Sequence, residues 1–441
     1  MARRPHHAPL NVFLNSRRVG RLRREPSGAI DFTYDPDWLG WSPALPISLS
    51  LPLREERYAG EPVIAVFDNL LPDSDQIRRA LAARVHAGGT DAYSLLGAIG
   101  RDCVGALQFL PVEHEPGPAG AVEAVPLQTA QISAMLGDLA QAPLGLTEDA
   151  TFRISLAGAQ EKTALLFQDG GWWVPAGTTA TTHILKPQIG RLPGGIDFSR
   201  SVENEYLCMK LTQAVGLQAA KVEIADFEGR RALIVERFDR RWTAEGRLLR
   251  LPQEDMCQAL SVPPAFKYEA HGGPGIEAVL RQLSGGDDPA KDQAAFLKAI
   301  VWYWLLGATD GHAKNFSIFL KPGGRYAMTP LYDVLSVQPA VDAGQVRHNQ
   351  FKLSMAVGAK RNYVMASILP RHFVETAARA NVGKPIVQQI FDGLSECAPS
   401  AIDTVKAGLP NDFPPDLLES VERGVQTRLK LLDQAKLDDM V

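Results

Sequence analysis

The sequence predicts an α+β protein with two lobes, an α/β front half followed by a mostly helical back half. The chain has 441 residues, which is enough for two packed lobes. Up to about residue 245, short segments rich in β-forming residues alternate with helical segments. From about residue 252 onward, long segments show helical periodicity and few β runs. This layout suits a bilobal nucleotide-binding enzyme, although many other folds share it.

The first 115 residues supply both strands and helices. Strands are expected at residues 11–15 and 30–34, which are rich in β-forming residues and are separated by turn residues. Helices are expected at residues 63–71 and 75–85, and either Asp73 or Ser74 can cap the second. The Pro/Gly-rich stretch at residues 115–120 is expected to be a surface loop.

The next part of the chain, to about residue 238, has a similar mixture. Strands are expected at residues 163–167, 172–175, 183–186 and 232–235, and one helix at residues 201–215. After it, a helix rich in aromatic residues is expected to end at Gly307.

Composition excludes several classes of protein. With 46 Lys+Arg against 50 Asp+Glu, the net charge is −4, so no overall attraction to nucleic acid or to an anionic membrane is expected. The longest apolar run, residues 299–308, is too short to span a bilayer. No apolar segment follows the basic N-terminus, so we expect that it is not a secretory signal. The four cysteines form no C-x-x-C pair, which argues against a zinc ribbon or a redox motif. We expect a soluble, cytoplasmic protein with reduced thiols.

The polar turn after Gly307 carries the most informative residues. In the segment Thr309-Asp310-Gly311-His312-Ala313-Lys314-Asn315, four residues separate Asp310 from Asn315. Protein kinases use this interval in their catalytic loop, where the Asp accepts the proton of the substrate hydroxyl and the Asn binds magnesium. Further on, Tyr332-Asp333 ends a short predicted strand with a carboxylate, and Asn315 and Asp333 would give Mg²⁺ the few protein oxygens it needs. Either piece alone is common by chance, but the two in this order favour a kinase.

Phosphoryl transfer also needs a cation on the ATP phosphates. Lys186 ends an apolar β-like segment, where kinases place this lysine, although an exposed lysine at a strand end is the commoner case. Glu205 or Glu203 of the following helix could pair with it, with Glu205 slightly preferred.

Two further segments could contact a nucleotide. Small residues precede the strand at residue 163, so the loop could bring N–H groups close to phosphates, although it matches neither a Walker A nor a G-x-G-x-x-G motif. Val235-Glu236-Arg237-Phe238-Asp239 leaves a β run as an inter-lobe hinge would, and Glu236 and Phe238 could pair with the adenine edge. The arginines near this hinge and those at residues 17–24 are expected to be solvated.

Together these segments resemble the HipA family, the kinase component of a bacterial toxin–antitoxin module. The similarity runs in the family's order from about residue 10 to 420. The matching stretches are 67–73, 99–102, 152–163, the strand ending at Lys186, 235–242, 251–256, 309–315 and 332–333.

The resemblance implies a distantly protein-kinase-like fold in three parts. These would be an N-terminal α/β subdomain at residues 1–115, a nucleotide-binding N-lobe at 116–245 and a helical C-lobe with the catalytic loop at 246–441. It implies that Asp310 is the catalytic base, that Asn315 and Asp333 bind Mg²⁺, and that Ser155 is an autophosphorylation site whose phosphate would repel ATP. It assigns nucleotide contacts to Ala157, Gly158, Ala159, Gln160, Glu161, Lys162, Lys186, Glu236, Arg237, Phe238, His312, Ala313, Lys314, Asn315, Tyr332 and Asp333.

The resemblance also implies partners. It predicts ATP and Mg²⁺ as cofactors, a small helix-turn-helix antitoxin dimer like HipB, and operator DNA bound mainly through that antitoxin, which would bring the chain to the nucleoid. Arg379 is the one basic residue left in the region where the family touches DNA. The family's protein substrate is a glutamate tRNA synthetase, whose phosphorylation arrests growth and leads to persistence.

Two alternatives share most of these features. A kinase of the same fold that acts on a small molecule would have the same Asp310, Asn315 and Asp333. A co-repressor that binds ATP and antitoxin but phosphorylates nothing would not need a base, so the presence of Asp310 and Lys186 argues against it.

Overall fold

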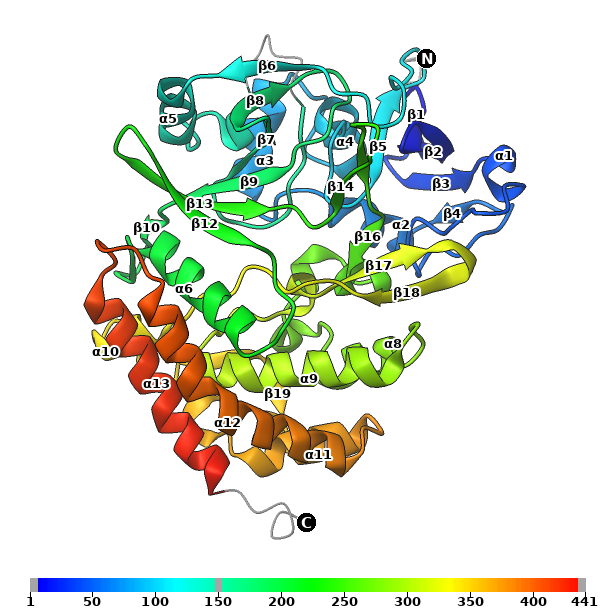
Figure 1. Ribbon diagram of the computed structural model, residues 1–441. Coiled ribbons are helices and arrows are strands. Elements are labelled where there is room, and N and C mark those ends of the chain that lie inside the picture. Colours follow the sequence, from blue (N-terminus) through cyan, green and yellow to red (C-terminus); the bar gives the residue numbers. More distant parts are fainter. Residues whose placement is uncertain (1–6, 147–152, 435–441) are drawn as a thin grey trace. The chain divides into compact units, whose positions relative to one another are not determined.

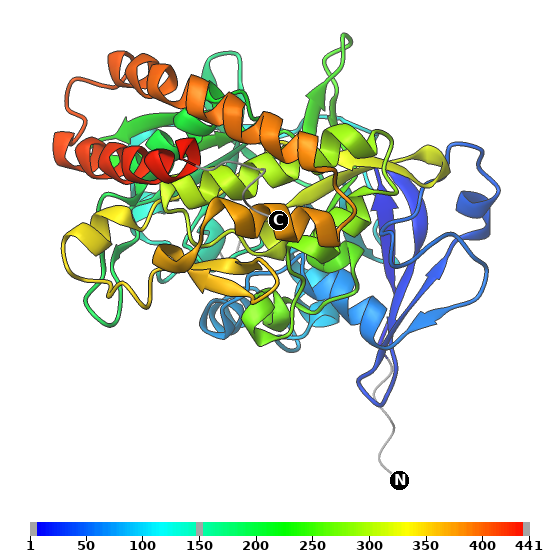
Figure 2. The same cartoon turned by 90° about the horizontal axis from the view of Figure 1, so that it is seen from below.

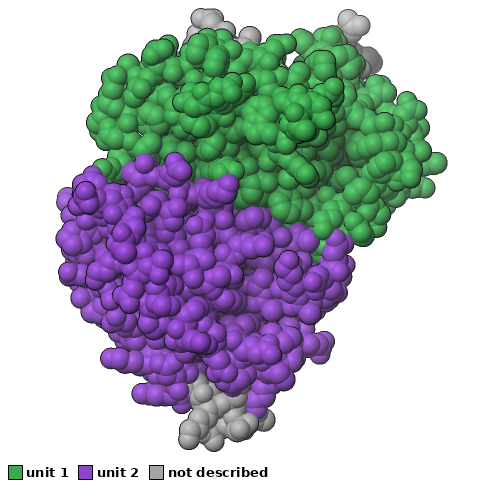
Figure 3. Space-filling model, viewed as in Figure 1, with its two compact units in different colours: residues 1–187, 225–265, 318–326 green, residues 188–224, 266–317, 327–441 purple. Residues whose placement is uncertain are grey.

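The computed structural model describes residues 7–146 and 153–434, which divide into two units. Unit 1 comprises residues 1–187, 225–265 and 318–326, and unit 2 comprises residues 188–224, 266–317 and 327–441 (Figure 3). Each unit is therefore assembled from segments that are far apart in the sequence. The finer division at residues 115 and 245 stays a prediction.

Unit 1 begins with an antiparallel five-stranded sheet of order β4-β3-β2-β1-β5 (Figure 1). Its strands are β1 (Leu10–Leu14), β2 (Arg17–Arg24), β3 (Ile30–Tyr34), β4 (Tyr58–Ala59) and β5 (Leu107–Pro111). The helices of this region are α1 (Pro36–Leu39), α2 (Glu61–Asp68), α3 (Asp75–Arg84) and α4 (Ala92–Ile99). The fully buried Phe67 of α2 lies 5.6 Å from the rings of both Phe32 and Phe109, so aromatic packing holds α2 on the sheet.

The predicted elements of this region are confirmed to within three residues. The helix predicted at residues 63–71 is α2, and the one predicted at 75–85 is α3. Ser74, not Asp73, caps α3, because its Oγ accepts a hydrogen bond from the Ile77 N–H at 3.4 Å.

A six-stranded sheet of order β12-β13-β9-β7-β8-β6 follows. Its strands are β6 (Ala124–Leu127), β7 (Thr163–Gln168), β8 (Gly171–Pro175), β9 (His183–Pro187), β12 (Val222–Phe227) and β13 (Arg230–Glu236). Helix α5 (Thr129–Gly137) covers it by packing Ile132 and Leu136 against Leu165 and Leu185 (Figure 1). The four strands predicted in this region are β7, β8, β9 and β13. The unpredicted β6 is an edge strand that contains Pro126 and exposes 63% of Val125, so its pattern is weak.

Several short strands lie beyond residue 240, where the sequence predicts few. They are β14 (Arg240–Trp242) paired with β15 (Leu248–Arg250), the sheet β16 (Gln253–Asp255), β17 (Ser317–Lys321) and β18 (Arg325–Met328), and β19 (Lys352–Val357) paired with β20 (Asn362–Val364). The tiny pair β10 (Gly190–Arg191) and β11 (Asp197–Phe198) belongs to unit 2. These strands have two to six residues, which is too short for periodicity to reveal.

Unit 2 is mainly helical, as predicted. Its helices are α6 (Ser201–Ala214), α8 (Ile276–Leu283), α9 (Pro289–Leu306), α10 (Gln338–Asp342), α11 (Pro370–Arg379), α12 (Lys384–Ala407) and α13 (Pro415–Asp433), while the short α7 (Met256–Ala259) belongs to unit 1. The long helices α12 and α13 run side by side (Figures 1 and 2). Turns of 3-10 helix are η1 (Pro143–Gly145), η2 (Pro264–Phe266), η3 (Glu269–His271), η4 (Ala313–Asn315), η5 (Pro322–Gly324) and η6 (Met365–Ser367). The mixture confirms the predicted fold class, and no helix in residues 7–146 or 153–434 is long and apolar enough to cross a membrane.

Helix α9 forms the buried axis of unit 2 and leads into the predicted catalytic loop. Asp288 caps its first turn by accepting a hydrogen bond from the Lys291 N–H at 3.2 Å. Trp302 and Trp304 are fully buried, and the Trp302 indole donates to Thr212 Oγ1 of α6 at 3.0 Å. The helix ends where Gly307 adopts a left-handed conformation with φ 71°, which confirms the predicted end.

A buried ion network in unit 1 corrects one prediction. Arg237 and Arg240 near the predicted hinge are not solvated but only 5% and 9% exposed. The carboxylate of Asp102 accepts hydrogen bonds from Arg240 and Arg250 at 2.8 Å and from Arg237 at 3.3 Å, and Asp239 pairs with Arg237 at 2.8 Å. Burial raises the pKa of Asp102, but the three guanidinium charges outweigh it and hold that pKa well below its usual range. The network joins residue 102, which lies between α4 and β5, to the end of β13 and to β14 and β15.

A second buried acid makes the stability of unit 1 depend on pH. Burial raises the pKa of Glu254, which accepts a hydrogen bond from the Leu49 N–H at 2.8 Å, to about 8. Because the folded state keeps this proton up to a higher pH than the unfolded chain, stability should fall as pH rises from about 4.5 to about 8. Glu254→Gln should remove that fall, on the order of 2–5 kcal/mol, in urea unfolding at pH 5.5, 7 and 8.5. The exposed Glu56→Gln should keep the slope of the wild type, and an unchanged slope in Glu254→Gln would contradict the assignment.

Candidate functional site

The residues predicted to form the site fall into two sets, one in each unit. Unit 2 contains Asp310, His312, Ala313, Lys314, Asn315, Tyr332 and Asp333. Unit 1 contains Ser155, residues 157–162, Lys186 and residues 236–238.

The predicted catalytic loop of unit 2 is a compact turn between α9 and β17. Its centre is the main-chain carbonyl of Asp310, which accepts hydrogen bonds from the His312 N–H and from Asn315 Nδ2, both at 2.8 Å. The side chain of Asn315 is thereby fixed with its amide nitrogen toward Asp310, which leaves its oxygen to act as an acceptor. The side chain of Asp310 is 63% exposed and is accessible to a substrate.

Tyr268 contacts the predicted base directly. Its hydroxyl donates a hydrogen bond to Asp310 Oδ1 at 2.8 Å, and its ring meets the ring of His312 edge-on with centroids 4.8 Å apart. The sequence analysis missed Tyr268, because a single tyrosine 42 residues before Asp310 forms no local motif with it.

The segment that carries Asp333 is tied to the catalytic loop. The Tyr332 hydroxyl donates to the Lys314 carbonyl at 3.0 Å and lies 2.5 Å from Ser317 Oγ. Asp333 adopts a left-handed conformation with φ 60°, a sparsely populated region that aspartate tolerates. Burial raises the pKa of the Tyr303 phenol of α9, and the charge of Asp333 raises it further. Asn315 and Asp333 thus belong to two segments joined by hydrogen bonds.

In unit 1, residues 70–73 hold the predicted nucleotide loop. Ser155 is fully buried, and its hydroxyl donates to the Leu70 carbonyl at 2.8 Å while its N–H donates to the Asp102 carbonyl at 2.9 Å. Gly158 pairs with Pro72 in a parallel bridge, and its carbonyl accepts a hydrogen bond from the Asp73 N–H at 3.2 Å. Hydrogen bonds at Ser155 and at Gly158 therefore fix the loop against residues 70–73.

Arg78 of α3 rigidifies the segment that holds the loop. Its guanidinium donates to the Pro72 carbonyl and to Asp68 Oδ1, both at 2.6 Å, and the side chain is 10% exposed. Residues 67–73, one of the stretches that resemble the HipA family, thus have a structural role, because their main-chain groups bond to residues 155–158.

Strand β9 brings Lys186 close to the end of the same loop. Gln160 Nε2 donates to the carbonyl of Pro187, the residue after Lys186, at 3.2 Å. Lys186 is 6% exposed, and Lys162 of the loop donates from Nζ to the Ala157 carbonyl at 2.8 Å. Unit 1 therefore gathers the loop and Lys186 at one end of β9.

The predicted hinge lies at the other end of β9. Glu236 is the register partner of His183, three residues before Lys186, which corresponds to about 10 Å along a strand. The Arg237 N–H donates to the Thr182 carbonyl at 2.9 Å, and the Phe238 ring packs edge-on against Phe319 at 5.9 Å. The side chain of Arg237 belongs to the buried ion network, so any nucleotide contact here would come from main-chain groups.

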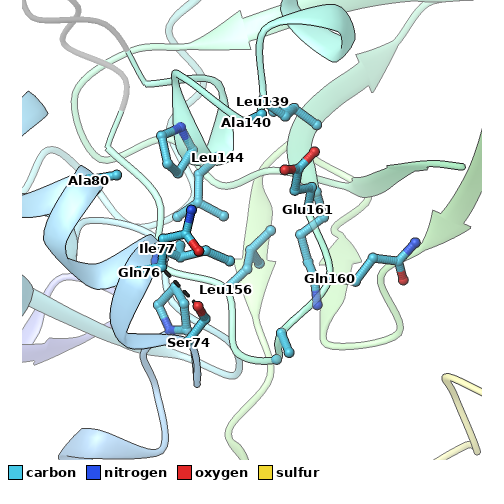
Figure 4. Close-up of a pocket in the computed structure, with 15 residues that line it drawn as sticks. Ser74, Gln76, Ile77, Ala80, Leu139, Ala140, Leu144, Leu156, Gln160 and Glu161 are labelled. Atoms are coloured by element: carbon cyan, nitrogen blue, oxygen red, sulfur yellow. Dashed lines mark hydrogen bonds between the residues drawn. The ribbon is translucent and has the colours of Figure 1, made fainter. Parts of the chain in front are cut away.

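A cavity of about 220 Å³ borders the loop within unit 1 (Figure 4). Its walls are the start of α3 with Ser74 and Ile77, the turn with Leu144, and the loop residues Leu156 and Glu161. Neither Lys186 nor the hinge lines it, so this cavity lies on the α3 side of the loop.

Some predicted contacts stay predictions. Glu203 and Glu205 of α6 are 5% and 3% exposed, and Glu203 Oε2 accepts a hydrogen bond from Gln188 at 2.7 Å, but both belong to unit 2 whereas Lys186 belongs to unit 1. Arg379 is half exposed and pairs with Glu277 at 2.7 Å. Within residues 7–146 and 153–434, no three or more His, Cys, Asp or Glu side chains gather in a way that could hold a metal. This finding does not concern the predicted magnesium ligands Asn315 and Asp333, which are only two residues and include an asparagine.

Comparison with known proteins assigns the family. The model of the HipA-like C-terminal domain matches residues 154–402, more than half of the chain, and that of the HipA N-terminal domain matches residues 10–110. The chain belongs to the HipA family. The resemblance inferred from the motifs is thereby confirmed.

Individual HipA relatives extend this finding. Y4mE of Sinorhizobium fredii, which is named provisionally as a kinase, is 37% identical over 90% of this chain and 91% of its own. The serine/threonine-protein kinase toxin HipA of Shewanella oneidensis is 29% identical over 79% and 78% of the two chains. In solved structures, the HipA chain of the Shewanella oneidensis complex of HipA, HipB and operator DNA has the same fold, with a TM-score of 0.81, 24% identity, and coverage of 98% and 99%.

Proposed function

We propose that this HipA-family chain is an ATP- and Mg²⁺-dependent serine/threonine protein kinase and the toxin of a toxin–antitoxin module. The observation that carries the proposal is the Asp310 loop. The exposed carboxylate of Asp310 follows the end of a buried helix. The main-chain carbonyl of Asp310 accepts a hydrogen bond from the side chain of Asn315, the fifth residue after it. This is the set of groups that protein kinases use for proton acceptance and magnesium binding.

In the proposed reaction, Asp310 accepts the proton of a serine or threonine hydroxyl while that oxygen forms its bond to the γ-phosphorus. The bond from the γ-phosphorus to the leaving oxygen of ADP breaks in the same step. Bound Mg²⁺ would neutralise the phosphate charge. Asn315 and Asp333 fit this ion, because both offer hard oxygen donors and their segments are joined through Tyr332.

The family resemblance assigns nucleotide contacts within each unit. Main-chain groups of residues 157–162 and the ammonium of Lys186 would contact the phosphates, and residues 236–238 would meet the adenine. His312, Ala313, Lys314 and Tyr332 would line the nucleotide from the catalytic loop. The hydrogen bond from Gln160 to Pro187 supports a common phosphate site of the loop and Lys186.

Ser155 would be the site of self-inactivation. Its hydroxyl is fully buried and hydrogen-bonded to Leu70, so it can receive a phosphoryl group only after the loop leaves this position. A phosphoserine with close to two negative charges would then oppose the return of the loop, because the Leu70 carbonyl accepts hydrogen bonds and cannot accommodate a dianion.

The test is incubation of the purified chain with labelled ATP and Mg²⁺, followed by mapping of the label. We expect phosphate on Ser155 and a loss of kinase activity as it accumulates. Ser155→Ala should sustain its activity severalfold longer than wild type in a time course, because the loop can no longer be modified. Ser133→Ala on α5 should behave as wild type. Absence of label from all of the chain and from proteins of a cell lysate, with ATP still bound, would overturn the proposal.

The partners follow from the same proposal. The HipA chain of similar fold was solved with HipB and operator DNA, which supports an antitoxin like HipB and DNA as partners. The antitoxin would be a small helix-turn-helix dimer. The chain would reach operator DNA, and thus the nucleoid, mainly through that antitoxin, with Arg379 as the candidate for direct contact. Its protein substrate would be a translation factor such as a glutamate tRNA synthetase, whose phosphorylation would arrest growth and cause persistence.

A further inference from the structure

The hydroxyl of Tyr268 lies 2.8 Å from Asp310 Oδ1. The Asp310 side chain is 63% exposed, so little packing restricts its rotation about χ1 and χ2. A hydrogen bond from a neutral phenol to a carboxylate is charge-assisted and therefore stronger than a bond between two neutral groups. The contact thus restrains the direction of this carboxylate on its Oδ1 side, while His312 Nε2 lies 3.9 Å from Oδ2.

Tyr268 is itself well held. Its ring meets His312 edge-on at an interplanar angle of 86°, and its carbonyl accepts hydrogen bonds from the N–H groups of His271 and Gly273, both at 3.0 Å. The turn is so tight that a Cβ at Gly273 would lie 1.9 Å from the Phe266 carbonyl oxygen. Because Tyr268 is held in place, its hydrogen bond can hold the Asp310 carboxylate in one orientation.

The residues on either side of Tyr268 in the sequence, Lys267 and Glu269, form hydrogen bonds with other segments of unit 2. The Lys267 carbonyl accepts a hydrogen bond from the Ala313 N–H of the catalytic loop at 3.4 Å. Glu269 Oε2 accepts one from the Ala356 N–H of β19 at 2.5 Å. Residues 267–269 therefore form a brace that joins the catalytic loop to β19 and carries the phenol at its centre.

We infer that Tyr268 is the positioning residue of Asp310. The inference rests on the proposed kinase function and adds a group to its site. The phenol keeps the carboxylate in one rotamer, so the proton of the attacking hydroxyl passes to Asp310 without prior reorientation of the side chain. Tyr268 itself gains and loses no proton in the step and need not touch ATP.

The experiment compares Tyr268→Phe with wild type in phosphoryl transfer to the protein substrate or to the chain's own serine, in the full-length protein. We expect kcat to fall about tenfold, as the loss of one hydrogen bond made in the transition state would cause, while KM for ATP stays within about twofold. The ring and its contact with His312 remain, so the melting temperature should not change. Tyr93→Phe, which removes a half-buried phenol of α4 in unit 1, should keep the wild-type kcat.

A double substitution separates positioning from a general structural effect. If Tyr268 acts through the Asp310 carboxylate, adding Tyr268→Phe to Asp310→Asn should reduce the residual rate by no more than about twofold. A wild-type or higher kcat in Tyr268→Phe, or a full tenfold further loss in the double variant, would overturn the inference while leaving the kinase function intact. A wild-type chain that transfers no phosphate would refute both, and the two failures are thus distinguishable.

Discussion

Asp310→Asn is expected to reduce the rate of phosphoryl transfer by about 100-fold or more, because it removes the proton acceptor for the substrate hydroxyl. The asparagine has nearly the same shape. The hydrogen bonds to the main-chain carbonyl from His312 and Asn315 do not involve the side chain and should persist. The measurement is a time course of label transfer from ATP at saturating Mg²⁺, together with the affinity for ATP by calorimetry.

The control for this substitution is Asp403→Asn, which changes an exposed carboxylate on α12 and should leave the rate unchanged. ATP binding should be similar in all three proteins, because Asp310 is not among the residues proposed to contact the nucleotide. A rate within about threefold of wild type would exclude Asp310 as the base. Loss of ATP binding as well as rate would indicate a structural role.

Asp102→Asn is expected to destabilise unit 1 by about 3–5 kcal/mol, the usual cost of breaking a buried ion pair by removing one partner. Asp102 and the three arginines around it are each at most 4% exposed in their side chains, so water cannot replace the lost charge. The asparagine amide would also place an NH2 donor where the carboxylate offers only acceptors, so that this donor would face the N–H donors of an arginine. Urea unfolding at pH 7, followed by tryptophan fluorescence, measures the effect.

Glu25→Gln provides the matched control, because its partner Arg57 and Glu25 itself are 59% and 42% exposed. This exposed pair should contribute less than about 1 kcal/mol. Equal losses for the two substitutions would contradict the assigned importance of the buried network. Arg250→Lys should fall between them, since it keeps the charge but not the planar set of donors.

Local sequence patterns were sufficient where one segment carries the whole signal. The strand at residues 30–34, the helix that ends at Gly307 and the Asp-x-x-x-x-Asn interval can each be recognised from neighbouring residues. The strands at residues 317–321 and 325–328 could not, because they are short and are stabilised by pairing with each other and with residues 253–255.

The arginines illustrate the limit of charge patterns. Arg240 and Arg241 are adjacent and chemically identical, yet one is 9% exposed and bonded to Asp102 and the other is exposed. Sequence alone predicts solvation for both, since burial of a guanidinium depends on a carboxylate brought from 138 residues away.

What the sequence by itself determined is the family, the α+β class and the residue types of the Asp310 loop, because these depend on motifs and their order along the chain. Only the tertiary structure decided that Tyr268 meets Asp310, that residues 70–73 hold the loop of Ser155, and that Asp102 gathers three arginines. The physical reason is distance along the chain. A hydrogen bond requires atoms about 3 Å apart, and between residues 42 or more positions apart only the fold can provide that approach.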